Sequence, residues 1–206
     1  KVDLTINGKG TLNVDGKKNN GIKANDTLHI TGGTYNITAV GDAFNVNDEL
    51  NITGTTMTID AKDDGIHASG DLVIDSGTYT VKNSTEGLEG KSITINGGDI
   101  TIYSTDDGVN AANKNAQQSE IFFTMNGGNL TVEVGQGDTD PIDSNGNITV
   151  NGGTIKMTGQ TGFDFDGTAT HTGGDIYFNG EKQTEIVNSI PGGGGPQGNG
   201  GPGGRP

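Results

Sequence analysis

The sequence predicts an all-β fold, a right-handed parallel β-helix of seven to eight coils with about 22 residues and three short strands in each coil. Three observations favour this solenoid. An acidic position recurs at Asp42, Asp64, Glu86 and Asp107, at steps of 22, 22 and 21 residues. Short runs of alternating apolar and polar residues are separated by Gly, Asn, Asp or Ser. Only 29% of the residues are hydrophobic, which suits a rod whose coils each need only a narrow apolar column.

Residues 70–91 represent one coil, with three alternating runs that begin near Leu72, Tyr79 and Leu88. Side chains alternate across a strand, so the apolar members of each run can face inward and stack on those of the next coil. The first column comprises Leu28/Ile30, Leu50/Ile52, Leu72/Ile74, Ile93/Ile95, Phe123/Met125 and Ile148/Val150. The second comprises Tyr35/Ile37, Met57/Ile59, Tyr79/Val81, Ile100/Ile102, Leu130/Val132 and Ile155/Met157. The third comprises Ile22/Ala24, Phe44/Val46, Ile66/Ala68, Leu88/Gly90, Val109/Ala111, Ile142/Ser144 and Phe163/Phe165.

Glycine pairs such as Gly127-Gly128 and Gly152-Gly153 separate the first two strands of a coil. Glycine tolerates positive φ, which suits a sharp corner. Stacked coils have parallel strands, and the handedness of parallel crossovers favours a right-handed coil.

The chain divides into a β-helix domain at residues 1–190 and a Gly/Pro-rich tail or linker at 191–206, which has no apolar side chains to bury. Residues 112–120 interrupt the repeat, and we expect them to project as a loop beside the acidic positions.

The formal charge of −14 argues against binding to nucleic acid or to an anionic membrane, both of which require basic patches. No apolar run is long enough to span a bilayer, and no secretory signal is found in this chain. The absence of cysteine excludes disulfides and thiolate metal sites. Nothing in the sequence indicates the oligomeric state.

Stacked coils would bring the acidic positions close together at the corner between the second and third strands. Like charges at the strand spacing of about 4.8 Å repel one another unless protons or cations neutralise them. Asp-Gly is also a good turn sequence, which explains one aspartate per corner but not doubled acids. Ca²⁺ prefers six to eight oxygen ligands. We therefore predict a calcium site formed by Asp42, Asp63, Asp64, Glu86, Glu89, Asp106 and Asp107.

A second acidic cluster follows the predicted loop. It comprises Asp138, Asp140 and Asp143, and then Asp164 and Asp166 about one coil later. One ion can bridge two coils here, although a solvated acidic edge is the equally simple interpretation.

These repeats resemble bacterial polysaccharide lyase-like β-helix proteins that bind carbohydrate, a family associated with cellulose and with acidic polysaccharides such as polygalacturonate. The matching motifs are the L-x-I-x-G-G strand, the D-D-G-I-x-A corner and the Gly/Pro tail, and the similarity covers residues 1–206. The resemblance implies an extracellular or cell-surface protein that binds plant cell-wall polysaccharide. It also implies calcium at Asp63-Asp64 and Asp106-Asp107, with Glu86 and Glu89 in the intervening coil.

Three functions are compatible with this sequence: calcium-dependent, non-catalytic polysaccharide binding, calcium-dependent pectate lyase activity, and a surface scaffold or adhesive rod. A lyase needs a lysine or arginine that loses its proton, whereas the lysines near the corner lie among carboxylates that keep them charged. The only arginine is Arg205, in the tail. We therefore favour binding, without catalytic residues. The predicted carbohydrate-binding residues are Tyr103, Lys62, Lys91, Asn110 and Lys114.

Overall fold

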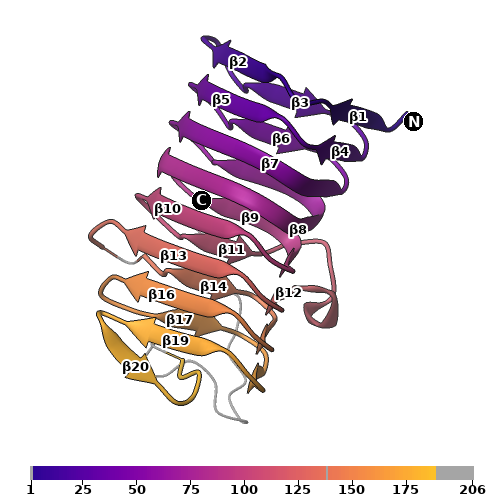
Figure 1. Ribbon diagram of the computed structural model, residues 1–206. Helices are drawn as coiled ribbons and strands as arrows, with labels where there is room; N and C mark the ends of the chain where they lie inside the picture. The colour runs from indigo at the N-terminus through magenta and orange to yellow at the C-terminus, as the bar shows by residue number, and fades with distance from the viewer. Residues whose placement is uncertain (1, 138, 189–206) are drawn as a thin grey trace.

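The computed structural model describes residues 2–137 and 139–188. It is a β-solenoid of about eight turns with parallel bridges about 22 residues apart, which confirms the predicted parallel β-helix. Figure 1 shows the coils stacked along one axis, from the first strands at one end to β19 and β20 at the other. The described residues contain no helix that is long and apolar enough to cross a membrane. The tail at 191–206 lies outside the described residues.

Each coil contributes strands to three faces, as the sequence columns predict. Face 1 contains β1 (Leu4–Asn7), β4 (Leu28–Thr31), the start of β7 (Leu50–Ala61), the middle of β8 (Ile66–Asn83), the end of β9 (Leu88–Ile95), β12 (Phe122–Met125), β15 (Asn147–Val150) and β18 (Ala169–His171). Face 2 contains β2 (Thr11–Gly16), β5 (Thr34–Ala39), the ends of β7 and β8, β10 (Asp99–Ser104), β13 (Asn129–Val134), β16 (Thr154–Thr158) and β19 (Asp175–Phe178). Face 3 contains β3 (Ile22–Ala24), β6 (Phe44–Val46), the starts of β8 and β9, β11 (Val109–Ala111), β14 (Ile142–Ser144) and β17 (Phe163–Phe165).

The rod departs from three separate strands per coil in two places, one in its middle and one at its C-terminal end. β7, β8 and β9 run through the corners that join face 1 to its neighbours, whereas in residues 2–137 and 139–188 no strand runs through the corner between faces 2 and 3. At the C-terminal end, β20 (Glu181–Gln183) pairs antiparallel with β19.

The interior consists of the apolar columns that the alternation of apolar and polar residues predicts. Leu28, Leu50 and Leu72 are successive partners on face 1, and each is fully buried. Tyr79 is also buried, and its hydroxyl bonds to the Thr55 hydroxyl at 3.1 Å and to the Ser76 carbonyl at 2.7 Å. These bonds satisfy the polar end of an otherwise apolar side chain.

An amide ladder joins successive coils at the corner between faces 1 and 2. Asn96 donates to Asp75 at 2.7 Å, Asn126 to Asn96 at 2.8 Å and Asn151 to Asn126 at 2.9 Å. Thr172 continues the ladder by donating to Asn151 at 2.7 Å. Each of these bonds satisfies a polar group of the next coil and fixes the register of the stack.

The two glycines at a face 1–face 2 corner differ in backbone conformation. Gly153 has φ +83°, in the left-handed region that glycine favours. Gly152 has no positive φ, but a Cβ there would lie 2.6 Å from the Asn126 carbonyl oxygen of the preceding coil. A Cβ at Gly153 would also lie 2.6 Å from the Gly128 carbonyl oxygen, so both glycines permit close stacking and the second also permits the turn.

The interruption at residues 112–120 is a loop between β11 and β12, as predicted, and it projects from the side of the rod in Figure 1. It includes the short 3₁₀ helix η1 (Gln118–Glu120). The Gln117 backbone N–H donates to the Glu120 carboxylate at 2.9 Å, and Asn113 donates to the Ser69 carbonyl at 3.0 Å. The first bond is internal to the loop, and the second joins the loop to β8 of the rod.

Candidate functional site

The acidic positions form one column along the corner between faces 2 and 3, which we call the corner column. Its members in successive coils are Asn20, Asp42, Asp64, Glu86, Asp107 and Asp140. The backbone N–H of a member donates to the side chain of the member before it, at 3.2 Å for Asn20, 3.3 Å for Asp42 and Asp64, and 2.8 Å for Asp107. One oxygen of each of these acids therefore supports the fold.

A second column, which we call the outer column, runs beside it on the outer side of face 3. It consists of Lys23, Asn45, His67, Glu89, Asn110, Asp143 and Asp164, which are register partners in successive coils. The two columns contact each other: Asn45 donates to Asp42, and Asn110 donates to the Glu86 carboxylate at 2.7 Å. Asn110 Oδ1 is buried and accepts no hydrogen bond from the described residues.

Doubled acids at a corner are not equivalent. Asp64 is buried in the corner column, whereas Asp63 is exposed. Burial raises the pKa of both carboxyls, and the neighbouring Asp64 adds to the rise at Asp63. Asp106 and Asp107 are both half-buried, and Asp107 is the one that accepts the bond from the next coil.

His67 provides a positive charge between Asp64 of the corner column and Glu89 of the outer column. Its Nδ1 lies 3.6 Å from Asp64 Oδ2 and also contacts Glu89 Oε2. Hydrogen bonding to Asp64 and Glu89 raises the pKa of His67 to about 10, against the smaller effect of burial. At neutral pH His67 is therefore an imidazolium that neutralises part of this charge. The sequence shows only that a histidine follows the Asp-Asp-Gly corner.

Two groups of ligand-type atoms converge here. They are Asp42, Asp64 and His67, and Asp64, Glu86 and Glu89, and within each group the potential ligand atoms lie within 4.8 Å of one another. The calcium prediction for this corner therefore has a geometric basis, although a charged His67 competes with a cation in the first group.

The second acidic cluster continues the same two columns. Asp140 belongs to the corner column, and Asp143 and Asp164 belong to the outer column. Asp166 lies at the exposed end of β17, and Asp138 is outside the described residues. The sequence treats the two clusters as separate because the loop lengthens the step from Asp107 to Asp140 to 33 residues.

Three carboxyls between His67 and the C-terminal end have strongly raised pKa values. Burial raises the pKa of Glu86 to about 8, with a further rise from Glu89. Burial and neighbouring acids raise the pKa of Asp107 to about 7 and that of Asp143 to about 8. Among residues 2–137 and 139–188, no lysine or histidine forms an ion pair with Asp107 or Asp143. Glu86, Asp107 and Asp143 therefore bind protons near neutral pH more readily than ordinary carboxyls, and a bound cation would favour their ionised forms.

A groove of about 790 Å³ lies between face 3 and the projecting loop. Its lining includes His67, Glu89 and Asp166 from the rod and Asn113, Lys114 and Asn115 from the loop. The groove therefore places charges of both signs beside the outer column.

The predicted carbohydrate-binding residues do not share one surface. Asn110 belongs to the outer column and Lys114 lines the groove. Lys62 is exposed at the corner between faces 2 and 3, and Lys91 forms an ion pair of 3.0 Å with Asp71. Tyr103 is 39% exposed and lies on face 2.

A family model described as carbohydrate-binding domain-containing protein matches residues 1–71 and 62–188. The chain belongs to this family. The two matches overlap and together cover the β-helix of this carbohydrate-binding domain. No curated protein and no solved structure matches the sequence.

Proposed function

We propose that this carbohydrate-binding domain binds acidic polysaccharide without catalysis, with its saccharide in the groove beside face 3 and with calcium held by the corner and outer columns. The observation that carries the proposal is the stacking of carboxylates from successive coils: Asn110 bonds to Glu86 and pairs in register with Asp143, beside a groove that Glu89 and Asp166 line.

The side chains fit a hard cation. Carboxylates and an amide oxygen are the ligand types that Ca²⁺ prefers, and Asn110 Oδ1 is a buried acceptor that receives no hydrogen bond from the described residues. We propose Glu86, Asp107, Asn110 and Asp143 as the main ligands, because His67 already neutralises Asp64 and Glu89. Asp42, Asp63, Asp106, Asp140, Asp164 and Asp166 would supply additional negative charge. A bound calcium ion would neutralise these acids and attract the carboxylate of a uronic acid.

The groove supplies the remaining contacts. The Lys114 ammonium and the His67 imidazolium can pair with sugar carboxylates, while Asn113 and Asn115 can bond to hydroxyls. We also propose an extracellular or cell-surface location and a plant cell-wall polysaccharide, as the resemblance to polysaccharide lyase-like proteins implies.

The charge of Lys91 supports a non-catalytic role. Hydrogen bonding to Asp71 raises the pKa of Lys91, so this lysine keeps its proton and is unsuited to removing one from a uronate. A lysine that acts as the base of a pectate lyase would need a lowered pKa instead.

Retention on immobilised polygalacturonate, with calcium or with a chelator, tests the proposal. We expect retention only with calcium, and we expect the double variant Asp107→Asn/Asp143→Asn to lose it. Glu133→Gln, an exposed carboxylate on face 2, is the control for charge. Steady release of unsaturated product, followed by absorbance, would indicate a lyase instead. Failure to bind either polygalacturonate or cellulose would favour a scaffold.

A further inference from the structure

Lys23 and Asn45 lie side by side on the first two coils of face 3. They are register partners on β3 and β6, on the outer side of the face, and Lys23 Nζ donates to Asn45 Oδ1 at 2.8 Å. By contrast, Lys91 pairs with the carboxylate of Asp71. Lys23 therefore places an amine nitrogen beside a side-chain amide, which is an acyl group that can release ammonia.

Asp42 holds the same amide from its other end. Asn45 Nδ2 donates to Asp42 Oδ2, while Asp42 Oδ1 accepts the backbone N–H of Asp64 at 3.3 Å. Asp42 is only 5% exposed, and both of its oxygens are engaged, so this carboxylate is fixed in place. The Asn45 amide is therefore held with its carbonyl group toward the Lys23 amine.

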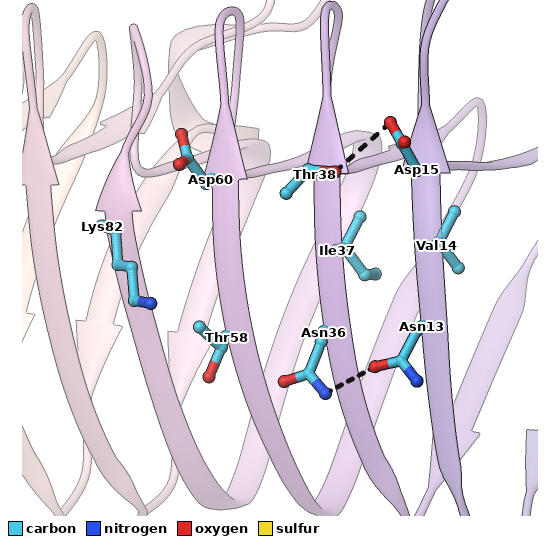
Figure 2. A pocket seen from close by; sticks show the side chains of 9 residues that line it. All are labelled: Asn13, Val14, Asp15, Asn36, Ile37, Thr38, Thr58, Asp60 and Lys82. Carbon is cyan, nitrogen blue, oxygen red and sulfur yellow. Dashed lines mark hydrogen bonds between the residues drawn. The ribbon is translucent and has the colours of Figure 1, made fainter.

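The same two coils are also joined on face 2, where Figure 2 shows two hydrogen bonds between register partners of β2 and β5. Asn36 Nδ2 donates to Asn13 Oδ1 at 2.7 Å, and Thr38 Oγ1 donates to Asp15 Oδ1 at 3.5 Å. These bonds help to keep the first coil in register with the second. Holding two reacting groups in register removes much of the entropic cost of bringing them together.

We propose that Lys23 and Asn45 form an isopeptide bond, which links the first coil covalently to the second. Lys23 is exposed, so its ammonium can lose a proton to solvent base. The unprotonated Nζ then attacks Asn45 Cγ: the Nζ–Cγ bond forms and the Cγ–Nδ2 bond breaks. Nζ gives up one proton and Nδ2 gains one and leaves as ammonia, so the step consumes no oxidant, reductant or cofactor. Asp42 is the positioning residue that orients the amide.

The first coil is less well buried than the second, so a covalent link here has a structural use. Leu4 and Leu12 of the first coil are 44% and 40% exposed, whereas their register partners Leu28 and Tyr35 are buried. Regions with few buried apolar contacts open locally more easily than the core. The bond would keep β3 beside β6 when the rest of the first coil opens.

Intact-mass spectrometry of the full chain tests the proposal, after incubation in chelator at about pH 9, where more of a lysine side chain is unprotonated than at neutral pH. We expect the mass to fall by about 17 Da, the mass of ammonia, and tryptic digestion to yield one branched peptide that contains Lys23 and Asn45. Lys23→Arg and Asn45→Ala should abolish the branched peptide. Lys82→Arg, which changes a lysine of face 2 that Figure 2 labels, should react as the wild type does.

Asp42→Asn should slow the loss of ammonia about tenfold in a protein whose circular dichroism spectrum and melting temperature match those of the wild type. Reaction of this variant at the wild-type rate would overturn the positioning role of Asp42.

A wild-type chain that keeps its full mass would overturn the isopeptide proposal. A gain of about 1 Da at Asn45 would also overturn it, because water would then have attacked the amide in place of the amine. A succinimide at an Asn-Gly step loses ammonia as well, but that loss persists in Lys23→Arg and yields no branched peptide. Loss of ammonia with this second pattern would likewise overturn the proposal. None of these outcomes bears on retention by polygalacturonate, which the Asp107→Asn/Asp143→Asn variant tests.

Discussion

The backbone N–H of Asp140 donates a hydrogen bond of 2.8 Å to Oδ1 of Asp107, although 33 residues separate them in the chain. The same contact joins Asp42 to Asp64 and Asp64 to Glu86. The corner column is therefore continuous past the projecting loop. Asp42, Asp64 and Asp107 therefore have a structural role through one oxygen. A bound cation would neutralise the negative charge of these carboxylates.

The first prediction concerns pH. In the absence of calcium, the melting temperature should fall as pH rises from about 5 to about 8.5. The pKa values of Glu86 and Asp143 are raised to about 8 and that of Asp107 to about 7, so the folded state binds more protons in this range than the unfolded state. The stability that these groups contribute is fully present below their unfolded pKa values, near 4, and is lost as pH rises through 7 to 8.

Thermal unfolding followed by circular dichroism in chelator, at several pH values, checks this dependence. Asp143→Asn should flatten it, while Glu133→Gln should not. Calcium should also flatten it, because a bound cation stabilises the ionised carboxylates. A melting temperature that rises over this pH range in chelator would contradict the assignment of raised pKa values.

A second prediction concerns His67. His67→Gln should destabilise the metal-free protein at pH 7 by about 1–3 kcal/mol, because the imidazolium that bonds to Asp64 and Glu89 is lost. Urea unfolding in chelator measures the effect, and calcium should recover part of the loss. His29→Gln, on face 1, is the matched control. Equal stability of the His67 and His29 variants would show that the imidazolium does not neutralise the column.

The amide ladder gives a third prediction. Asn126→Ala removes the donor to Asn96 and the acceptor for Asn151, so it should lower the free energy of unfolding by about 1–3 kcal/mol. Asn51→Ala, on face 1 outside the ladder, should cost less. Chemical unfolding of both variants provides the comparison, and a ladder variant as stable as the Asn51 variant would exclude a stabilising role for the ladder.

A fourth prediction concerns the glycine that follows each acidic corner. A Cβ at Gly108 would lie 2.1 Å from Val132 Cγ1 and 2.6 Å from the Pro141 carbonyl oxygen. Gly108→Ala should therefore destabilise the fold by about 1–3 kcal/mol. Gly10→Ala, where no atom lies within 4 Å, should have little effect on the melting temperature. Equal melting temperatures for the two alanine variants would contradict this prediction, because they would show that the coils accommodate a Cβ at Gly108 without loss of stability.

The apolar columns were predictable because a coil period and an alternation of side chains are both local properties of the sequence. Thus Leu50 and Leu72 could be assigned to one column before their pairing was known. The amide ladder was missed, although the recurrence of Asn or Thr before the Gly-Gly corners at Asn96, Asn126 and Asn151 was a signal for it. The distinction between Asp63 and Asp64 depends on how the corner turns, which the repeated Asp-Asp-Gly does not reveal.

The site was only partly predictable, since it depends on contacts between coils. The loop changes the step length, so Asp107 and Asp140 do not appear as neighbours in the sequence. Tyr103 and Lys114 are 11 positions apart in the sequence, yet Tyr103 belongs to face 2 and Lys114 lines the groove at face 3. Proximity along the chain is a poor guide to a shared surface in a solenoid, where one coil passes over three faces.

Calorimetric titration of oligogalacturonate into the chelator-treated protein, and then into the same protein with calcium, tests the central claim most directly. The proposed function predicts saturable binding with calcium and affinity at least tenfold weaker without it. Equal affinity in the two conditions, or no binding in either, would contradict calcium-dependent recognition of acidic polysaccharide.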